Sequence, residues 1–291
     1  MHLFKIDKEW SAAKNEFPII FMGDFHGGCP NCDYDLLESA VDEISKEKEA
    51  IVFLMGDLAE YITKDDKRFL PSQIDRRFWG KMEYLPMAYL EWLVELLEPI
   101  AHFIEVVHDG NHERSIISHM YPGLELCSRL RAKLETKFGP EFAQTKLKYA
   151  PGEAYTKITF KTRTDSDYKT IMVNSAHGWQ GGRQPGGKHN ALFQLFEWVN
   201  ADIIMRAHAH DLFAEPGPVR EEPNPQMTKL VEIPTICGCT GSFLRTRNVE
   251  VEQSDRPGYA EYRGYRPSRR GYVRVDLKLS KKEIERKISV K

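Results

Sequence analysis

Asp24 and His26 follow an apolar run, Phe17-Pro18-Ile19-Ile20-Phe21, within the heptapeptide Met-Gly-Asp-Phe-His-Gly-Gly at positions 22–28. In an extended chain, residues two apart point the same way. The carboxylate and the imidazole could therefore share a proton or a metal ion. A capping Asp and a surface His in a glycine-rich turn would give the same pattern. For this stretch alone, the turn is the commoner explanation.

Four further apolar runs end in residues of the same kind. One ends in Gly56-Asp57, with Glu60 three residues later, and another in Gly110-Asn111-His112-Glu113. The remaining two end in His177 and in Arg206-Ala207-His208-Ala209-His210. Ligands of open α/β sheets bind outside the carboxyl ends of the strands. We therefore expect these five positions, far apart in the sequence, to meet in space.

The elements expected to position these residues alternate between strand and helix. Apolar, β-branched runs predict strands, and an apolar period of about 3.6 residues predicts helices. The expected order is strand 17–22, helix 35–49, strand 51–55, helix 79–100 with a break or start at Pro86, strand 103–107, helix 124–138, strands 155–160 and 169–174, helix 190–199 and strand 202–206. Further strands are expected at 230–233, around Phe243 and at 271–277, with loops at 215–225 and 248–270. This order predicts an α/β fold in which helices cover sheets whose strands end at one edge.

The composition is that of a soluble globular protein, since 41% of the 291 residues are hydrophobic and 29% are charged. A formal net charge of −2 gives no global reason to expect a polyanionic partner, although a basic face can exist on a near-neutral protein. No apolar run is long enough to span a bilayer, and residues 1–14 lack the apolar core of a signal peptide. We therefore expect no membrane partner and a cytoplasmic location, in the host cytoplasm if the protein is viral.

The five motifs in their order, D-x-H, G-D, G-N-H-[DE], H and H-x-H, resemble those of the calcineurin-like metallophosphoesterase superfamily over residues 19–210. The likeness is to phage and prokaryotic members, which are related to DNA-repair nucleases. The resemblance implies an α/β fold, a four-layer αββα sandwich with two mixed β-sheets packed face to face and helices outside. It implies a single domain over residues 1–291. Residues 60–100 are then expected as an insertion or cap-like segment, and residues 215–291 as the strands and long loop that complete the sandwich.

The same resemblance implies two divalent metal ions as cofactors. Seven residues with oxygen or imidazole donors would hold them: Asp24, His26 and His210 for one ion, Asn111, His177 and His208 for the other, and Asp57 as a bridge between the two. Such ligands suit Mn²⁺, Fe²⁺, Zn²⁺, Co²⁺ or Ni²⁺, and we expect Mn²⁺ first. Two ions about 3.5–4 Å apart lower the pKa of a bridging water, supply hydroxide near neutral pH and neutralise the charge of the phosphate.

By resemblance, His112 is expected to be catalytic, as the general acid that protonates the leaving oxygen, an effect of about 10²–10⁴-fold. Glu60 and Glu113 are expected to orient neighbouring ligands. Arg183, in a glycine-rich loop, is expected to contact a substrate phosphate, with Lys188 nearby. Asp109, where relatives often have a small or apolar residue, would add negative charge near the site.

The expected function is hydrolysis of a phosphodiester, which includes the nuclease reaction. A phosphomonoesterase or protein phosphatase is the alternative within the enzymes. A non-catalytic binding scaffold of the same fold ranks below both, because all seven ligand positions and the acid are filled. The partner is then a phosphate-ester substrate. Nucleic acid is one candidate, because seven arginines and three tyrosines occur between residues 245 and 270, although a solvated loop is the favoured explanation of that segment.

Several other residues have simpler explanations. The five cysteines, Cys29, Cys32, Cys127, Cys237 and Cys239, include two close pairs that could bind zinc, but free thiols are expected in a reducing compartment. His108 and His119 flank the third motif, and an ordinary packed or surface histidine is expected at both. A homo-oligomer is compatible with the sequence, with residues 60–100 as one candidate surface.

Overall fold

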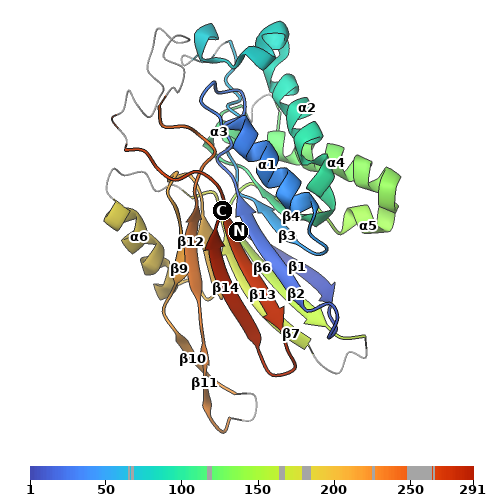
Figure 1. Cartoon of the computed structure of the whole chain (residues 1–291), viewed down its shortest axis with the longest axis vertical. Helices are drawn as coiled ribbons and strands as arrows, with labels where there is room; N and C mark the ends of the chain where they lie inside the picture. Colours follow the sequence, from blue (N-terminus) through green and yellow to red (C-terminus); the bar gives the residue numbers. More distant parts are fainter. Residues whose placement is uncertain are drawn as a thin grey trace.

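The computed structural model describes residues 1–64, 66, 69–116, 120–163, 168–178, 185–224, 227–247, 264 and 266–291. Two six-stranded sheets pack face to face, and helices cover the outer face of each (Figure 1). Each sheet contains both parallel and antiparallel strand pairs. The expected fold class, an αββα sandwich with two mixed sheets, is therefore confirmed.

The first sheet carries the early motifs. Its order is β14 (Ile284–Val290), β13 (Val273–Leu279), β2 (Glu16–Met22), β3 (Ile51–Leu54), β4 (Ile104–His108) and β5 (Lys148–Ala150). The strands from β2 to β5 are parallel, β13 runs antiparallel to β2, and β14 runs antiparallel to β13. The strands β2, β3 and β4 are almost continuously apolar because both of their faces are buried, as is usual for parallel strands between two layers.

The second sheet carries the late motifs. Its order is β1 (His2–Glu9), β6 (Ala154–Lys161), β7 (Tyr168–Ser175), β8 (Ile203–Arg206), β12 (Ile236–Thr240) and β9 (Leu212–Pro216). The predicted hairpin is confirmed, because β6 and β7 pair antiparallel from Ala154 opposite Ser175 to Lys161 opposite Tyr168. The strands β7 and β8 are parallel, so His177 and His208 follow strands that end at the same edge.

Helices cover both outer faces. The first sheet is covered by α1 (Tyr34–Ser45), α2 (Leu85–Leu97) and α4 (Pro122–Phe138), and the second by α6 (Pro185–Gln194) and the short 3₁₀ helix Leu195–Glu197 (Figure 1). In α1, Leu37, Val41 and Ile44 form the buried stripe that the helical period predicted, and Asp33 accepts from the backbone N–H of Leu36 at the start of the helix.

Three apolar layers hold the sandwich together. One lies between the two sheets and includes Phe17, Phe53 and Phe160, one lies under α1, α2 and α4, and a smaller one lies under α6. Each fully buried Ile or Phe side chain contributes about 1.5–3 kcal/mol to folding. Leu90 and Leu93 of α2 are fully buried in the helical layer. The division of residues 60–100 from the rest of the domain stays a prediction.

Some elements differ from the expectation. The edge strands β1 and β14 were not predicted. Phe243 is in no strand; the strand there is β12, which ends at Thr240. The expected helix 79–100 is a 3₁₀ segment, Arg76–Tyr84, then α2 with Pro86 in its first turn, then a second 3₁₀ segment, Glu98–Phe103.

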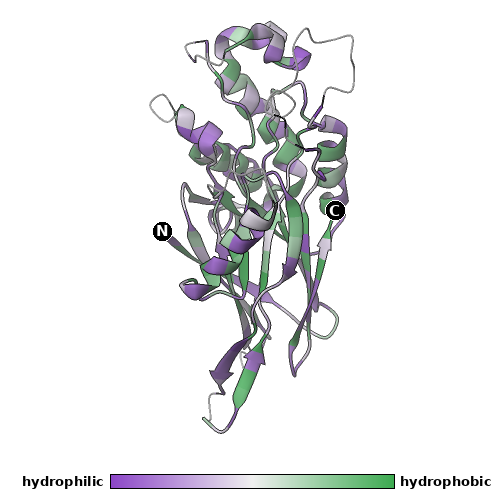
Figure 2. Cartoon of the chain, turned by 90° about the vertical axis from the view of Figure 1, so that its left-hand side faces the viewer, coloured by the Kyte–Doolittle hydropathy of each residue, from purple (hydrophilic) through white to green (hydrophobic). Residues whose placement is uncertain are grey.

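The remaining short elements lie around these layers: a 3₁₀ turn Pro71–Gln73, α3 (Asn111–Ser115), α5 (Pro140–Gln144), β10 (Arg220–Pro223) and β11 (Leu230–Ile233). The loop expected at 215–225 instead contains β10, which pairs with β11 in a hairpin that projects from the end of the sandwich (Figure 2). Within the described residues, no helix combines the length and apolar character needed to cross a lipid bilayer.

Candidate metal centre

The five motifs lie at one edge of the sandwich, where the strands end. Asp24 and His26 follow β2, Asp57 follows β3, and Asn111 begins α3 shortly after the end of β4. From the second sheet, His177 follows β7, and His208 and His210 follow β8. The backbone joins them further, because the N–H of Asp24 donates to the carbonyl of Gly56 and the N–H of His26 to that of Asp57. The structure thus brings together residues from both sheets.

Asp24, His26 and His210 form a first cluster of potential ligands. The Nε2 atoms of His26 and His210 are 3.0 Å apart, and Asp24 Oδ1 lies 3.3 Å from His210 Nε2 and 3.9 Å from His26 Nε2. Asp24 is fully buried, and its Oδ1 accepts no hydrogen bond. A buried carboxylate oxygen without a donor has a free-energy penalty, which a cation between these three atoms would remove.

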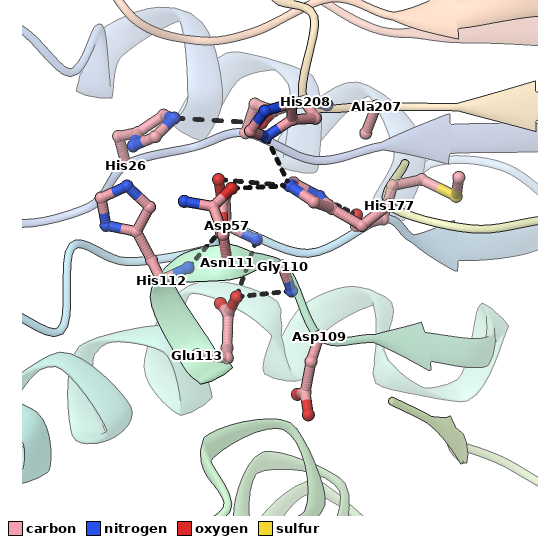
Figure 3. A network of polar contacts seen from close by, with 12 residues as sticks. His26, Asp57, Asp109, Gly110, Asn111, His112, Glu113, His177, Ala207 and His208 are labelled. Atoms are coloured by element: carbon pink, nitrogen blue, oxygen red, sulfur yellow. Dashed lines mark hydrogen bonds and ion pairs between the residues drawn. The ribbon is translucent and has the colours of Figure 1, made fainter. Parts of the chain in front are cut away.

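Asp57, Asn111, His177 and His208 form a second cluster (Figure 3). His177 Nε2 is 3.3 Å from Asn111 Oδ1, 3.3 Å from Asp57 Oδ2 and 3.2 Å from His208 Nδ1. Four side chains from four strand ends therefore surround one point. Metal–ligand bonds of about 2.0–2.2 Å place adjacent ligands roughly 3 Å apart, so the spacing of the donor atoms in both clusters fits a divalent ion.

The imidazoles are turned so that a lone pair faces each cluster. His177 Nδ1 lies 2.8 Å from the carbonyl oxygen of Met55 and can donate to it, so in the neutral imidazole Nε2 is the nitrogen with a lone pair for a metal. His26 Nδ1 lies 2.9 Å from Glu60 Oε1, which leaves its Nε2 for the first cluster in the same way. The residues present therefore fit the two ions that the sequence predicted. The bridging role of Asp57, which groups with the second cluster, stays a prediction.

The electrostatics favour ionised carboxylates. Burial alone would raise the pKa of Asp57, but the imidazoles of His177, His112 and His26 lower it below its ordinary value. Burial likewise opposes the ionisation of Asp24, and the His210 and His177 imidazoles lower its pKa. A carboxylate must be ionised to bind a divalent cation, and both carboxylates here are ionised among imidazoles that can bind the same ion.

The backbone at this edge is strained. Five of the seven proposed ligands have a left-handed conformation, with φ between 49° and 66°: Asp24, His26, Asp57, His208 and His210. Elsewhere in the described residues, Tyr61, Leu147 and Met227 are the other non-glycine residues with positive φ. Non-glycine residues adopt this conformation rarely, and it accumulates at functional sites. The backbone therefore adopts an unfavourable conformation at these five residues, and this conformation directs their side chains into the clusters.

Two glycines allow the turns after β3 and β4 to approach each other. Gly56 has φ +87°, and a Cβ atom at that position would overlap the backbone nitrogen of Gly110. A Cβ on Gly110 would overlap Asp57 Oδ1. The glycine before Asp57 and the glycine before Asn111 are therefore required by the packing of the site itself.

Glu113 fastens these two turns together. Its buried carboxylate accepts from the backbone N–H groups of Asp57 at 2.9 Å, Leu58 at 2.8 Å and Gly110 at 2.8 Å (Figure 3). Burial raises the pKa of Glu113 to about 7, with a further contribution from Asp57. The orienting role expected of Glu113 takes a specific form here, since the side chain holds backbone groups rather than a ligand side chain.

Glu60 connects His26 to His112. Its Oε1 is 2.9 Å from His26 Nδ1 and its Oε2 is 3.4 Å from His112 Nδ1. The Nδ1 of His112 also lies 2.8 Å from the backbone oxygen of Glu60, and the His112 backbone N–H donates to Asp57 Oδ1 at 2.8 Å. Burial lowers the pKa of His112, but Glu60 and Asp57 more than offset this and raise it above its ordinary value.

Other residues near the motifs have structural roles. Asp109 points away from the clusters (Figure 3) and accepts from the hydroxyl of Tyr149, so the expected negative charge at the site is absent there. His108 is fully buried; its Nδ1 lies 2.8 Å from the oxygen of Gly152 and its Nε2 2.9 Å from Ser175 Oγ. It is the packed histidine that was expected. Arg183 and His119 lie outside the described residues.

Lys188 binds the backbone between two proposed ligands, and the cysteines lie outside both clusters. Lys188 Nζ donates to the oxygen of Ala209 at 2.8 Å, between the ligands His208 and His210. All five cysteines are free thiols in the structure, and Cys127, Cys237 and Cys239 are buried. Among the described residues, the groups with metal-ligand spacing contain no cysteine. Sequence reasoning missed the two ion pairs that Asp33 forms with Arg245 and Arg270.

Comparison with known proteins agrees with this geometry. The sequence model of the calcineurin-like phosphoesterase family matches residues 17–212, about two thirds of the chain, and the chain belongs to this family. A comparison with curated proteins finds no match.

Solved structures with a similar fold include proteins described as phosphoesterases. A conserved uncharacterized protein of Streptococcus pneumoniae, described as a predicted phosphoesterase, is 14% identical, with 94% of this chain and 90% of that chain covered and a TM-score of 0.34. A metallophosphoesterase of Sphaerobacter thermophilus is 12% identical, with 94% and 88% covered and a TM-score of 0.35. A double mutant of Vps29 from Entamoeba histolytica is 13% identical, with 94% and 99% covered and a TM-score of 0.35.

Proposed function

We propose that the protein is a metal-dependent phosphodiesterase that cleaves its substrate by attack of water, with His112 as the general acid. One observation carries the proposal. Two clusters of imidazole, carboxylate and amide donors, each with the spacing of metal ligands, lie beside a histidine that is held by its own carboxylate. A scaffold of the same fold would have no need for complete clusters or for strained turns that maintain them.

The first cluster would hold one ion and the second cluster the other. When bound, such ions supply the nucleophile, by lowering the pKa of water, and neutralise negative charge on the phosphate. Mn²⁺ is our first expectation, and Fe²⁺, Zn²⁺, Co²⁺ and Ni²⁺ suit the same donors. The other requirements, orientation of the ligands and transfer of a proton, fall to residues of this chain.

His112 supplies the proton. Its Nδ1 donates to the backbone oxygen of Glu60 at 2.8 Å, so Nε2 is the atom available to a substrate. The ester P–O bond breaks as a P–O bond to the water oxygen forms, the water releases one proton to solvent, and the leaving oxygen takes its proton from Nε2. His112 is then neutral and regains a proton from solvent. The neighbouring carboxylates of Glu60 and Asp57 favour the protonated state from which this step starts.

The proposal is tested by metal reconstitution and turnover. Protein treated with a chelator and reloaded with Mn²⁺, Co²⁺, Ni²⁺ or Zn²⁺ is assayed with bis-p-nitrophenyl phosphate, a diester, and p-nitrophenyl phosphate, a monoester. We expect two bound ions per chain and a higher kcat/KM for the diester. A higher kcat/KM for the monoester would favour a phosphomonoesterase instead. Protein that binds no ions and turns over neither ester would favour a binding scaffold.

Variants separate the acid from the ligands. His112→Gln should lower kcat by about 10²–10⁴-fold while both ions remain bound, and Asp57→Asn should lose metal and activity together. His102→Gln is the matched control, because His102 packs against Phe103 and Phe138 in the helical layer. If His112→Gln lost its metal, or kept its kcat, the assignment of the acid would be wrong.

A further inference from the structure

Two carboxylates beside the first cluster each hold two cations. Asp33 accepts from Arg245 Nη2 at 2.8 Å and from Arg270 Nη1. Asp211 Oδ2 lies 3.6 Å from Lys188 Nζ and 3.9 Å from Arg266 Nη2. We call Arg245, Arg270, Lys188 and Arg266 the cationic rim. Each carboxylate neutralises one of its two partners, so these pairs, taken among the described residues, carry two more positive than negative charges.

Both halves of the rim are attached to metal-ligand residues. On one side, the backbone N–H of Asp33 donates to Phe243, and Phe243 and Ser242 both donate to the backbone oxygen of Asp24. On the other side, Asp211 follows His210 directly, and Lys188 binds the carbonyl of Ala209. The segments that carry Arg245 and Arg270, drawn in orange-brown and red, run across the same end of the sheets (Figure 1).

The charge of the cationic rim differs in sign from that of the whole chain. The whole chain has a formal net charge of −2, so the positive charge of the rim is not a general property of the surface. The rim is also accessible, since the side chains of Arg245, Arg270 and Arg266 are 33%, 36% and 61% exposed. Three of its four cations are arginine, whose planar donor fork fits two phosphate oxygens at once.

We propose that the cationic rim binds the phosphates that flank the scissile phosphate of a nucleic-acid strand, and that the substrate of the site is a polynucleotide. The inference rests on the proposed phosphodiesterase function. A small diester has one phosphate and would leave the rim unused. A polynucleotide carries a phosphate at every residue, so that one phosphate at the clusters brings its neighbours to positions beside Asp24 and His210.

The test compares substrates on the same metal-loaded protein. Single-stranded DNA, duplex DNA, RNA and inorganic polyphosphate are assayed beside bis-p-nitrophenyl phosphate. We expect at least one polynucleotide to be cleaved with a higher kcat/KM than the small diester. We also expect kcat/KM for the polynucleotide to fall as salt rises, with a slope in the log–log plot of about −0.7 for each phosphate contact to a single strand.

Rim variants identify the residues. In the double variant Arg245→Gln with Arg266→Gln, the ratio of kcat/KM for the polynucleotide to that for the small diester should fall about tenfold, and the salt slope should become shallower. Arg266→Gln alone carries little folding risk, because this exposed side chain lies 3.9 Å from its partner, and it should shift both readouts in the same direction.

Arg220→Gln is the matched control. Arg220 Nη2 lies 2.8 Å from Asp202 Oδ1, the same distance as in the Arg245–Asp33 pair, but Asp202 precedes β8 and so lies at the opposite end of that strand from His208. The control should change neither the ratio nor the salt slope. Thermal unfolding of every variant separates a lost contact from a lost fold.

The outcomes are distinguishable. Turnover of the small diester without turnover of any polynucleotide would overturn the substrate assignment and leave the phosphodiesterase function standing. Preference for polyphosphate would also overturn it, in favour of another polyanion. Equal losses in the rim variants and the Arg220 control would show that the rim has no special role. No turnover of any ester would instead contradict the proposed function.

Discussion

The backbone N–H of His208 donates to Asp24 Oδ2 at 2.8 Å. Asp24 belongs to the first motif, on the sheet that contains β2, and His208 belongs to the last, on the sheet that contains β8. One oxygen of Asp24 is thus fixed by the second sheet, and the other, Oδ1, faces His26 and His210. The hydrogen bond aims the free oxygen and joins the two sheets at the site.

Asp24→Asn should remove one of the two ions. The amide oxygen can still accept from the His208 N–H, but the negative charge at the first cluster is lost. We expect the metal content to fall from two ions per chain to about one, with the remaining ion in the second cluster. Elemental analysis after dialysis against a weak chelator measures this. Retention of two tightly held ions would contradict the assignment of Asp24 as a ligand.

Glu60→Gln should weaken metal binding at the first cluster and slow catalysis. The carboxylate holds the Nδ1 of His26 and lies beside that of His112, while the backbone oxygen of Glu60, which binds His112, is unchanged by the substitution. Loss of a carboxylate that orients a metal-bound histidine typically lowers affinity or activity by about 10–100-fold. Calorimetric titration with Mn²⁺ gives the affinity. An unchanged affinity together with an unchanged kcat would show that Glu60 orients neither histidine.

Glu113→Gln should destabilise the fold. The two oxygens of Glu113 accept from three backbone N–H groups, and a glutamine would turn its own NH₂ group toward at least one of these donors. A buried donor left without an acceptor costs about 1–3 kcal/mol. Urea unfolding of the metal-free proteins measures the difference. Glu135→Gln, on the exposed side of α4, is a suitable control and should change the free energy of unfolding little.

His108 should make stability depend on pH. Burial lowers its pKa in the folded state to about 3, against 6.5 for the ordinary group, although the hydrogen bonds to Gly152 and Ala150 oppose the shift. The unfolded chain therefore binds a proton on His108 that the folded chain does not. The stabilising effect is fully present above pH 6.5 and is lost as the pH falls from 6.5 toward 3, at up to about 1.4 kcal/mol per pH unit.

A comparison with His108→Gln isolates this effect. Glutamine can donate to the same backbone oxygens and does not titrate. Between pH 7.5 and pH 5.5, the wild-type protein should lose about 1.4 kcal/mol more of its free energy of unfolding than the variant does. Urea unfolding in the presence of a chelator keeps metal binding out of the measurement. Parallel pH curves for the two proteins would mean that His108 is not buried in its neutral form.

The positions of the site residues were predictable because each follows an apolar run. Such runs form buried strands, and parallel strands end at one edge, so Asp24, Asp57 and Asn111 had to meet. The edge strands β1 and β14 were not predictable in the same way. In β1, His2–Glu9, exposed and partly buried residues alternate, and one residue is fully buried. Its apolar signal is too weak to separate a strand from a polar segment.

Other features depend on contacts that no local pattern contains. Phe243 is apolar but packs edge-on against Phe25, with ring centroids 5.3 Å apart, and is not part of a strand. The strand before it, Ile236–Thr240, consists largely of small residues and gives a weak apolar signal. Asp33 could be recognised as a helix cap, but its partners Arg245 and Arg270 are more than 200 residues away in the sequence.

The left-handed turns have a consequence for the evolution of this chain. Each non-glycine residue in that conformation costs about 1 kcal/mol, so the five residues together cost about 5 kcal/mol, which is comparable with the 5–15 kcal/mol by which a typical domain is stable. Glycine at any of them would relax the chain and raise the melting temperature of the metal-free protein, but it would delete a ligand. Selection for heat resistance alone would therefore be expected to replace these five residues first, whereas selection for metal binding would retain them.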